Sequence, residues 1–433
     1  REMSAPRLMG AAFAALLASA APALAQDMAI TNARLVIGDG TPPIENGTVV
    51  VRGGKVVAAG AGVAVPADLK PIDVGGRWVT PGLVVAVTDL GLVDVEAVDD
   101  SNDTDARKAP FSAGLDIAPA INPSAQPIAI SRGGGVTRAA VAPLGTSGIF
   151  RGQGAVIDLG ADPRAVVQAR AFQYVDLGEA GAQVAGGSRV AVLAELRNAL
   201  LEARELSLAP AGARRDDVLL TRTDAAALIA VVTGKQPLYV RADRAADIRM
   251  ALALREEFPA LKLTLVGATE GWMVAGDIAT AGVPVIATPL SDLPQSFERL
   301  GATQSNVGRM AAGGVKVALG AFFDQPRYAP QYAGNLVALN KVPGAKGLSW
   351  DKAFVAISSG PAEILGMGDR FGSLKSGRAA DVVVWDGDPL ELTSGAVRVF
   401  IDGVEQPLDN HQTRLRDRYR TPTEGSLPKA YDW

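Results

Sequence analysis

The sequence contains no cysteine and only one histidine, His411, among its 433 residues. Without cysteine the chain can form no disulfide, carry no lipid on a cysteine and offer no thiolate to a metal ion. Zinc sites in hydrolases usually use two or three imidazoles, so a single histidine cannot supply such a site. Because His411 lies in a polar stretch near the end of the chain, we expect a surface residue and not a metal ligand.

Charge and hydrophobic content set further limits. The formal net charge of -4 at pH 7 gives no basic footprint for nucleic acid. Aromatic residues are scarce at 5%, but hydrophobic residues make up 48% of the chain, enough to fill a large core. A chain of this length typically carries two or three domains, or one barrel with an attached domain. These limits favour a soluble, enzyme-sized protein.

The first residues have the pattern of a targeting segment. Arg7 precedes an apolar stretch from Leu8 to Ala21, and Ala23-Leu24-Ala25 fits a small-residue cleavage site before Gln26. The apolar stretch is too short and too rich in alanine to span a bilayer comfortably. We therefore expect residues 1–25 to be a signal peptide, and the mature chain to be periplasmic or secreted, with no stable membrane span.

The later chain alternates β-branched runs with helical patterns, which predicts parallel strands joined by crossover helices. One predicted outer helix covers Ala191 to Leu206. The loops that follow the predicted strands are rich in glycine, proline or charge, and in an α/β barrel such loops form the active face. Four predicted strands stand out: Leu238 to Ala242, Leu261 to Val266, Val283 to Ala287 and Val315 to Leu319.

Several motifs carry a resemblance to a known family. Trp78 to Gly91 reads W-V-T-P-G-L-V-V-A-V-T-D-L-G, and Phe371 to Glu405 contains a G-x-L-x-x-G-x-x-A-D-x-V-x-x-D-x-D-P run. The first resembles the first barrel strand of the amidohydrolase superfamily, in its imidazolonepropionase-like branch, and the second resembles that family's carboxyl-terminal return. Ile30 to Gly60 is similar to its amino-terminal sandwich strands, and Ser358 to Met367 to its helix before the return. Gly152 to Ile157 resembles a G-Q-G hairpin of the family, which we favour over a phosphate loop.

The resemblance implies an α/β fold with two structural parts. A TIM-like (β/α)8 barrel is expected over residues 78–370. Residues 26–77 together with 371–408 would form a composite β-sandwich domain. Residues 409–433 are predicted to be a polar C-terminal tail, loose or bound to the surface, in which Arg414, Arg416, Arg418 and Arg420 alternate with other residues.

The ligand positions implied by the resemblance are mostly occupied by other residues. The family's H-x-H pair on the first strand corresponds here to Val87 and Asp89. Its histidine at the end of the fifth strand falls within Tyr239 to Asp243, its histidine at the end of the sixth within Leu265 to Glu270, and its aspartate after the eighth within Gly320 to Asp324. The family normally holds zinc or another divalent metal, but only Asp89 offers a donor in register. We therefore expect no metal cofactor.

Carboxylates at the barrel mouth leave other possibilities open. Arg241 and Asp243 would form a buried ion pair in the space where a metal would otherwise sit, and this is the interpretation that we favour. The acidic loop 89–105 has oxygen donors suited to a hard cation, but it lacks D-x-D-x-D-G spacing. Four acids remain candidates for acid/base catalysis: Asp89, Asp243, Glu270 and Asp324.

Two functions remain open at this point. The resemblance implies a hydrolase of C–N bonds in amides or cyclic amides, whereas the residue inventory favours a pseudoenzyme without the usual activation of water. Such a protein would bind a small polar molecule at the mouth, or assemble with itself or with an intact paralogue, because family members with an intact site commonly form oligomers. No nucleic-acid partner is expected.

Overall fold

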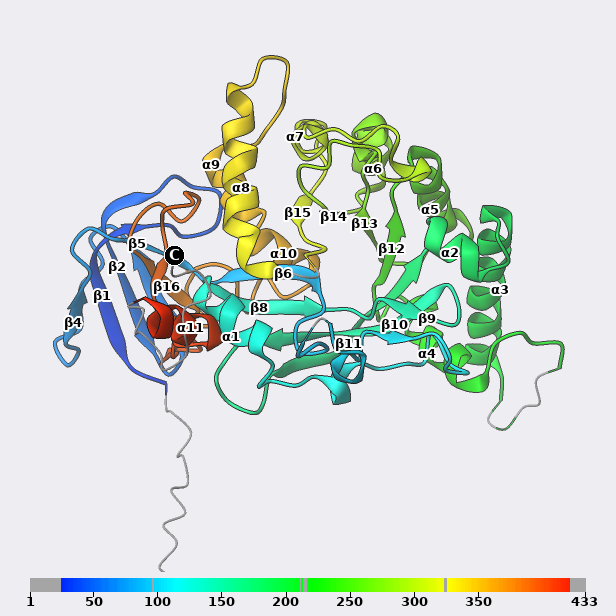
Figure 1. Ribbon diagram of the computed structural model, residues 1–433, viewed down its shortest axis with the longest axis horizontal. Helices are drawn as coiled ribbons and strands as arrows, with labels where there is room; N and C mark the ends of the chain where they lie inside the picture. The colour runs from blue at the N-terminus through cyan, green and yellow to red at the C-terminus, as the bar shows by residue number, and fades with distance from the viewer. Residues whose placement is uncertain (1–24, 96, 211, 213–215, 323–324, 421–433) are drawn as a thin grey trace, which may run out of the picture.

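The computed structural model describes residues 25–95, 97–210, 212, 216–322 and 325–420. The predicted signal peptide therefore lies outside the described residues except for Ala25, and Asp324 also lies outside them. Two large sheets dominate, one at the left of Figure 1 and one in the larger part at its right. Among the described residues, no helix is both long enough and apolar enough to cross a membrane.

The smaller part is a mixed sheet built from both ends of the chain. Its strand order is β18-β17-β16-β5-β1-β2-β3, and β4 pairs with β1. The antiparallel pair β5 and β16, with Val79 opposite Val384, joins the two chain ends. Because β5 belongs to this sheet, the chain enters the barrel at Leu83, slightly after the predicted boundary at residue 78. The strands are β1 (Met28–Leu35), β2 (Ile44–Arg52), β3 (Lys55–Gly60), β4 (Pro71–Asp73), β5 (Trp78–Pro81), β16 (Val382–Trp385), β17 (Ala396–Ile401) and β18 (Val404–Glu405).

The larger part is an α/β barrel, as the sequence predicted. Its eight strands have the order β15-β14-β13-β12-β11-β10-β8-β6, and a bridge between Ala86 and Gly320 brings the two edges together. The strands are β6 (Leu83–Thr88), β8 (Val136–Val141), β10 (Phe150–Asp158), β11 (Val166–Asp176), β12 (Leu238–Ala242), β13 (Leu263–Gly267), β14 (Val285–Ala287) and β15 (Val317–Leu319). The four strands predicted from the later chain are β12 to β15. The predicted G-Q-G hairpin is the pair β10 and β11, and β10 runs antiparallel to both of its neighbours.

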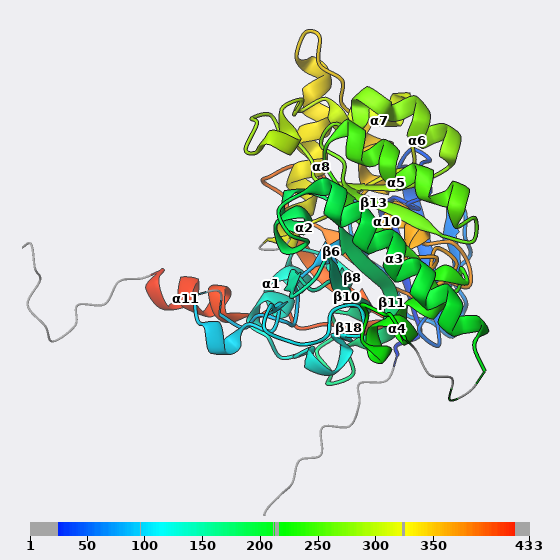
Figure 2. The same cartoon turned by 90° about the vertical axis from the view of Figure 1, so that its right-hand side faces the viewer.

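Helices cover the outside of the barrel strands (Figures 1 and 2). The predicted helix is α3, which starts after Ser188, whose side chain accepts a hydrogen bond from the Val190 amide. Its buried residues Val192, Leu196 and Leu200 recur every four positions and pack towards the strands. The helices are α1 (Gln126–Gly133), α2 (Glu179–Val184), α3 (Arg189–Leu208), α4 (Arg222–Val232), α5 (Ala245–Glu257), α6 (Ala275–Ala281), α7 (Asn306–Ala312), α8 (Ala329–Ala338), α9 (Trp350–Val355) and α10 (Ser359–Ile364).

The described part of the C-terminal tail forms a helix, where the sequence predicted only a polar tail. This helix, α11 (His411–Tyr419), starts with a capping box in which Asn410 and Thr413 bond each other's backbone amides. None of its residues is buried, and Figure 2 shows it projecting from the body of the molecule. His411 is exposed, as predicted. The strong cap explains how a segment with almost no apolar residues becomes helical.

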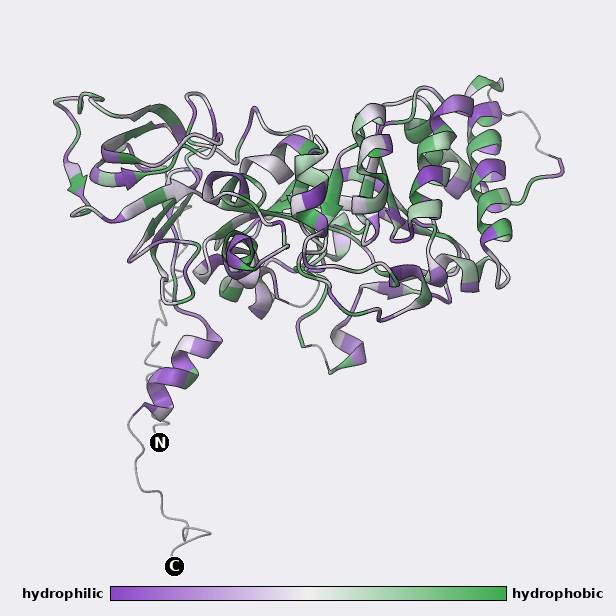
Figure 3. Ribbon diagram, turned by 90° about the horizontal axis from the view of Figure 1, so that it is seen from above, coloured by the Kyte–Doolittle hydropathy of each residue, from purple (hydrophilic) through white to green (hydrophobic). Residues whose placement is uncertain are grey.

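Alternation along the strands separates an outer core from an interior core. Val240 and Ala242 of β12 pack among helix residues, whereas Tyr239 packs with residues of the other strands. Successive side chains of a strand point to opposite faces, so Tyr239 and Arg241 both face the barrel interior. That interior is largely apolar and contains Val84, Ala86, Val87, Ala140, Ala142, Phe172, Val266, Ile286 and Ala318. Figure 3 shows the hydrophobic strands inside and hydrophilic residues on the outer helices.

A buried ion pair joins the barrel to the composite sheet. Arg138 on β8 donates two hydrogen bonds to Asp381, from Nε to Oδ2 at 2.7 Å and from Nη2 to Oδ1 at 2.8 Å. Their side chains are only 4% and 2% exposed. Arg138 also lies 2.8 Å from Asp402 and 3.9 Å from Asp158. The aspartate of the A-D-x-V motif therefore holds the carboxyl-terminal return against the barrel.

We predict that Asp158 makes the protein less stable above pH 6. Burial raises the pKa of Asp158 from 3.8 to about 6, although Arg138 opposes this shift. A raised pKa in the folded state contributes stability that is present below pH 3.8 and is lost as the pH rises through about 6. D158N should therefore be more stable than the parent at pH 7, with a free energy of unfolding that is higher by roughly 1 to 3 kcal/mol. At pH 3.5 the two free energies of unfolding should differ little.

Urea unfolding at a series of pH values checks this prediction. The exposed neighbour Asp162, whose carboxylate also accepts a backbone hydrogen bond, supplies the control variant D162N. Its effect should stay within about 0.5 kcal/mol at pH 7. A constant difference between D158N and the parent from pH 3.5 to pH 7 would contradict the assignment.

Candidate functional site

Charged side chains gather where the barrel strands end. Parallel barrel strands bring their carboxyl ends to one face, and the loops on that face carry the chemistry of such barrels. Arg241 and Asp243 stand at the end of β12, and Glu270 follows β13. Glu298 and Arg299 lie in a short 3-10 helix, Phe297–Arg299, in the loop after β14. We call this set, together with its ion-pair partners, the mouth cluster.

Asp243 is held by two elements. Its Oδ1 accepts hydrogen bonds from the Thr269 amide at 3.1 Å and from the Thr269 hydroxyl at 2.6 Å. Its Oδ2 accepts from Arg299, from Nη2 at 3.1 Å and from Nε at 3.3 Å. The predicted ion pair with Arg241 is present, but at 3.8 Å it is the longer of the two. No sequence pattern pointed to Arg299, because it lies 56 residues further along the chain.

The Glu270 carboxylate accepts hydrogen bonds from two backbone amides. Its Oε2 accepts a hydrogen bond from the Ala245 amide at 2.9 Å, at the start of α5. Its Oε1 accepts from the Gly301 amide at 2.9 Å. A carboxylate at a helix N-terminus is favoured by the helix dipole. Glu270 therefore fixes α5 relative to the loop after β14, although it is one of the predicted catalytic acids.

The other acids of the mouth cluster each have a guanidinium of their own. Asp176 pairs with Arg151 at 3.0 Å. Glu298 lies 3.4 Å from Arg189 and accepts a hydrogen bond from the Glu179 amide at 2.6 Å. Asp247 pairs with Arg189 at 2.9 Å and with Arg244 at 2.6 Å. Most of these pairs join residues far apart in sequence, so the cluster was not predictable from spacing.

The other predicted acids are Asp89, Asp324 and those of the acidic loop. Asp89 is half-buried at the end of β6, and Asp324 lies outside the described residues. In the acidic loop, Asp94 accepts a hydrogen bond from Asn122 at 2.9 Å and Asp105 pairs with Arg107 at 2.7 Å. The structure thus brings Asp243 and Glu270 together, with a bond of 2.9 Å from the Glu270 amide to the Asp243 carbonyl, but it directs their carboxylates to different partners.

The described donors do not fit the metal that the resemblance implies. Val87, Val266 and Phe322 are 0%, 2% and 5% exposed and offer no lone pair. At the end of the fifth strand the inward side chain is a guanidinium, which repels a cation. Within the described ranges, no three His, Cys, Asp or Glu residues are grouped so that they could hold a metal ion.

The backbone at the mouth is strained. Val87, Ala268, Leu290 and Ala321 have φ values of 61°, 48°, 60° and 60°, and each lies close to the carboxyl end of a barrel strand. A left-handed conformation is rare for a residue with a Cβ, and for a β-branched residue such as Val87 it is an outlier. Strain of this kind persists only where the surrounding structure fixes it, and it often marks ligand sites.

Burial shifts the pKa values of several side chains in the barrel interior and at its mouth. It raises the pKa of Tyr174 to about 12, an effect that Arg241 opposes, and it also raises the pKa of Tyr239. Burial lowers the pKa of Arg241, but Tyr174, Asp176 and Asp243 raise it more, so the guanidinium stays charged. Burial also raises the pKa of Glu298, with Asp243 adding to the shift.

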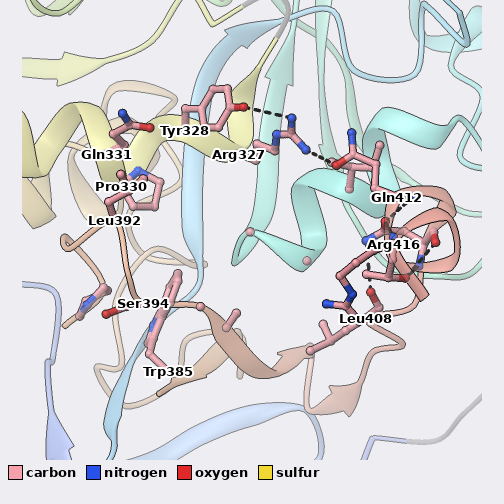
Figure 4. A pocket seen from close by; sticks show the side chains of 18 of the residues that line it. Arg327, Tyr328, Pro330, Gln331, Trp385, Leu392, Ser394, Leu408, Gln412 and Arg416 are labelled. Atoms are coloured by element: carbon pink, nitrogen blue, oxygen red, sulfur yellow. Dashed lines mark hydrogen bonds between the residues drawn. The ribbon is translucent and has the colours of Figure 1, made fainter. Parts of the chain in front are cut away.

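A separate groove lies away from the mouth cluster. It has a volume of about 920 Å³ and lies between α1, the start of α8, α11 and the segment after β16 (Figure 4). Arg327 links its walls by donating to Gln412 and, at 3.1 Å, to the Tyr328 hydroxyl. The groove shares no residue with the mouth cluster and contains none of the predicted catalytic acids.

Comparisons with known proteins agree with the fold. Residues 278–405 match the family model described as "Amidohydrolase family". An amidohydrolase from Thermotoga maritima superposes with a TM-score of 0.76 and 26% identity, covering 87% of this chain and 99% of that one. The chain is thus similar to amidohydrolases over its fold and, in residues 278–405, over its sequence. The imidazolonepropionase-like branch stays a prediction.

Two further matches cover little of the sequence or have low identity. An amidohydrolase named tasK, from Hapsidospora irregularis, is 47% identical over 60 residues, which are 14% of this chain and only 6% of that protein. The structure of an adenosine deaminase from Xanthomonas campestris with bound zinc superposes with a TM-score of 0.52 and 18% identity, covering 93% of this chain and 100% of that one. At that identity the likeness shows the fold alone. These comparisons do not identify the site residues of this chain, which are therefore argued from its own structure.

Proposed function

We propose that this chain is a metal-independent member of the superfamily that binds a small ligand at the barrel mouth and no longer hydrolyses C–N bonds. One observation carries the proposal: the inward-facing residue at the end of β12 is Arg241, in the region where the resemblance implies a metal ligand. A metal-activated water needs donors and an open coordination position. A guanidinium supplies neither.

The alternative, a hydrolase with an atypical carboxylate site, is less well supported. General acid/base catalysis needs a carboxyl group that can reach the substrate and exchange a proton. Asp243 is 1% exposed and already accepts from Thr269 and Arg299, and Glu270 accepts two backbone amides. Both carboxylates are therefore committed to holding the mouth together.

We propose in addition that the chain is exported after cleavage near Ala25, on the basis of the Ala-x-Ala pattern alone. Assembly with a second copy or with an intact paralogue stays a prediction. The loop after β14 offers a surface for it, because Leu293, Phe297 and Leu300 are 74%, 82% and 64% exposed. Light scattering of the purified mature chain tests the first of these assemblies, and capture from a periplasmic extract tests the second.

An activity assay tests the loss of hydrolysis. The mature chain should release no product above the buffer rate from a panel of N-acyl amino acids, ureas and cyclic imides, with or without added Zn²⁺, Mn²⁺ or Mg²⁺. Turnover that survives repurification and is abolished in D243N or E270Q would contradict the proposal and favour the atypical hydrolase.

A further inference from the structure

Of the guanidinium groups in the mouth cluster, that of Arg241 lies farthest from its nearest described carboxylate. Each nearby carboxylate has a closer guanidinium: Asp176 has Arg151 at 3.0 Å, Asp243 has Arg299 at 3.1 Å, and Glu298 has Arg189 at 3.4 Å. Arg241 lies within 4 Å of one carboxylate, that of Asp243, at 3.8 Å, which is too long for a hydrogen bond. Arg241 therefore has no described carboxylate within hydrogen-bond distance.

The hydrogen-bond donors of Arg241 are also unused by the described protein. The guanidinium donates no hydrogen bond to any described residue, and its side chain is 32% exposed, so it can be reached from solvent. A guanidinium has five N–H donors in a planar fork that matches a carboxylate. The backbone of Arg241 pairs with Asp176 on β11 and with Val266 on β13, so the guanidinium lies between these strands at the mouth.

Two tyrosines lie one layer deeper in the barrel. The parallel ladder pairs Tyr174 with Tyr239 and, one step nearer the mouth, Asp176 with Arg241. Tyr174 is 3% exposed and donates no hydrogen bond to a described residue, and the hydroxyl of the fully buried Tyr239 has no partner there either. Buried polar groups in proteins are normally satisfied, so the Tyr239 hydroxyl, which has no described partner, adds a polar atom to the interior below Arg241.

We propose that Arg241 binds the carboxylate of a small organic acid at the barrel mouth, with the Tyr174 hydroxyl as an additional donor. This proposal rests on the function proposed above and names its ligand class. The fork of the guanidinium accepts a planar carboxylate through two parallel bonds. A dianionic phosphate fits less well, because Asp176, Asp243 and Glu298 stand close to the same guanidinium.

Titration calorimetry and thermal unfolding of the full mature chain test the proposal. The probes are acetate and butyrate, with butyramide as the uncharged counterpart, phosphate as the competing anion, and sodium chloride at equal ionic strength. We expect saturable binding of a carboxylate, and binding of butyramide and phosphate that is weaker by about tenfold or more.

Three variants connect the binding to the named residues. R241M should weaken carboxylate binding by about tenfold or more, R241K by a smaller factor because lysine keeps the charge but loses the fork, and Y174F by roughly threefold. The control is R249M, since Arg249 lies on the outside of α5 in a pair with Asp277 and is 60% exposed. It should leave binding unchanged. R241K and Y174F keep the test decisive if R241M fails to fold.

The outcomes separate this inference from the proposed function. Carboxylate binding that is equal in the parent, R241K and Y174F would overturn the site. Saturable binding of phosphate or of neutral molecules only, in a chain without hydrolytic activity, would overturn the carboxylate class and leave the binding function standing. Hydrolysis of the amide panel would overturn the proposed function itself, whatever the carboxylates do.

Discussion

Replacing Asp381 by alanine is expected to lower the free energy of unfolding by about 3 to 5 kcal/mol. The variant leaves Arg138, whose side chain is 4% exposed, without the carboxylate that takes two of its hydrogen bonds. A buried charge that loses its partner keeps its desolvation cost and loses its compensation. Asp402 and Asp158 reduce the expected decrease in the free energy of unfolding, because both lie within 4 Å of the same guanidinium.

The matched control is a pair with similar geometry at the surface. Arg398 donates two hydrogen bonds of 2.7 Å to Glu405, but these side chains are 32% and 38% exposed. E405A should therefore cost less than about 1 kcal/mol in the same urea titration. A double variant that replaces Arg138 and Asp381 by apolar residues should recover much of the loss. Equal effects of D381A and E405A would show that burial does not govern the strength of this link.

G267A is expected to lower the free energy of unfolding by roughly 2 to 4 kcal/mol. Gly267 has a φ of 88°, and a Cβ built there would lie 2.6 Å from the Asp243 Oδ1. The left-handed backbone alone costs about 1 to 2 kcal/mol for a residue with a Cβ. Displacing Asp243, which Thr269 and Arg299 hold in place, adds the cost of weakened buried hydrogen bonds.

G282A separates these two contributions. Gly282, at the end of α6, has a φ of 64° and no atom within 4 Å of a built Cβ. It should therefore show only the backbone cost of about 1 to 2 kcal/mol in chemical denaturation. If G267A is no more destabilising than G282A, the Asp243 carboxylate is not fixed by Thr269 and Arg299.

The fold was largely predictable because its signals are local. Runs such as Leu238 to Ala242 have the composition of a buried strand, and β12 has the same bounds. Motifs near both ends of the chain implied the composite sheet, which the pairing of β5 with β16 confirms. The antiparallel direction of β10 could not be predicted, because strand direction depends on connections and pairing and not on periodicity. The helix α11 was missed since its cap outweighs its lack of apolar residues.

The site was predictable only in part. The sequence contains too few histidines for the usual imidazole ligands, and it predicted an ion pair of Arg241 with Asp243 in the space where a metal would otherwise sit. It could not find Arg299 for Asp243 or Arg151 for Asp176, because those contacts depend on how the loops return to the mouth. Nor could it assign Glu270 to the Ala245 and Gly301 amides, since backbone partners leave no trace in composition.

Metal analysis of the purified mature chain tests the central claim most directly. Elemental analysis should find far less than one equivalent of zinc, iron or manganese per chain after dialysis, and the midpoint of thermal unfolding should not change with a chelator, because the mouth is held by ion pairs. One tightly bound transition metal per chain, whose removal lowers the unfolding midpoint, would contradict the account.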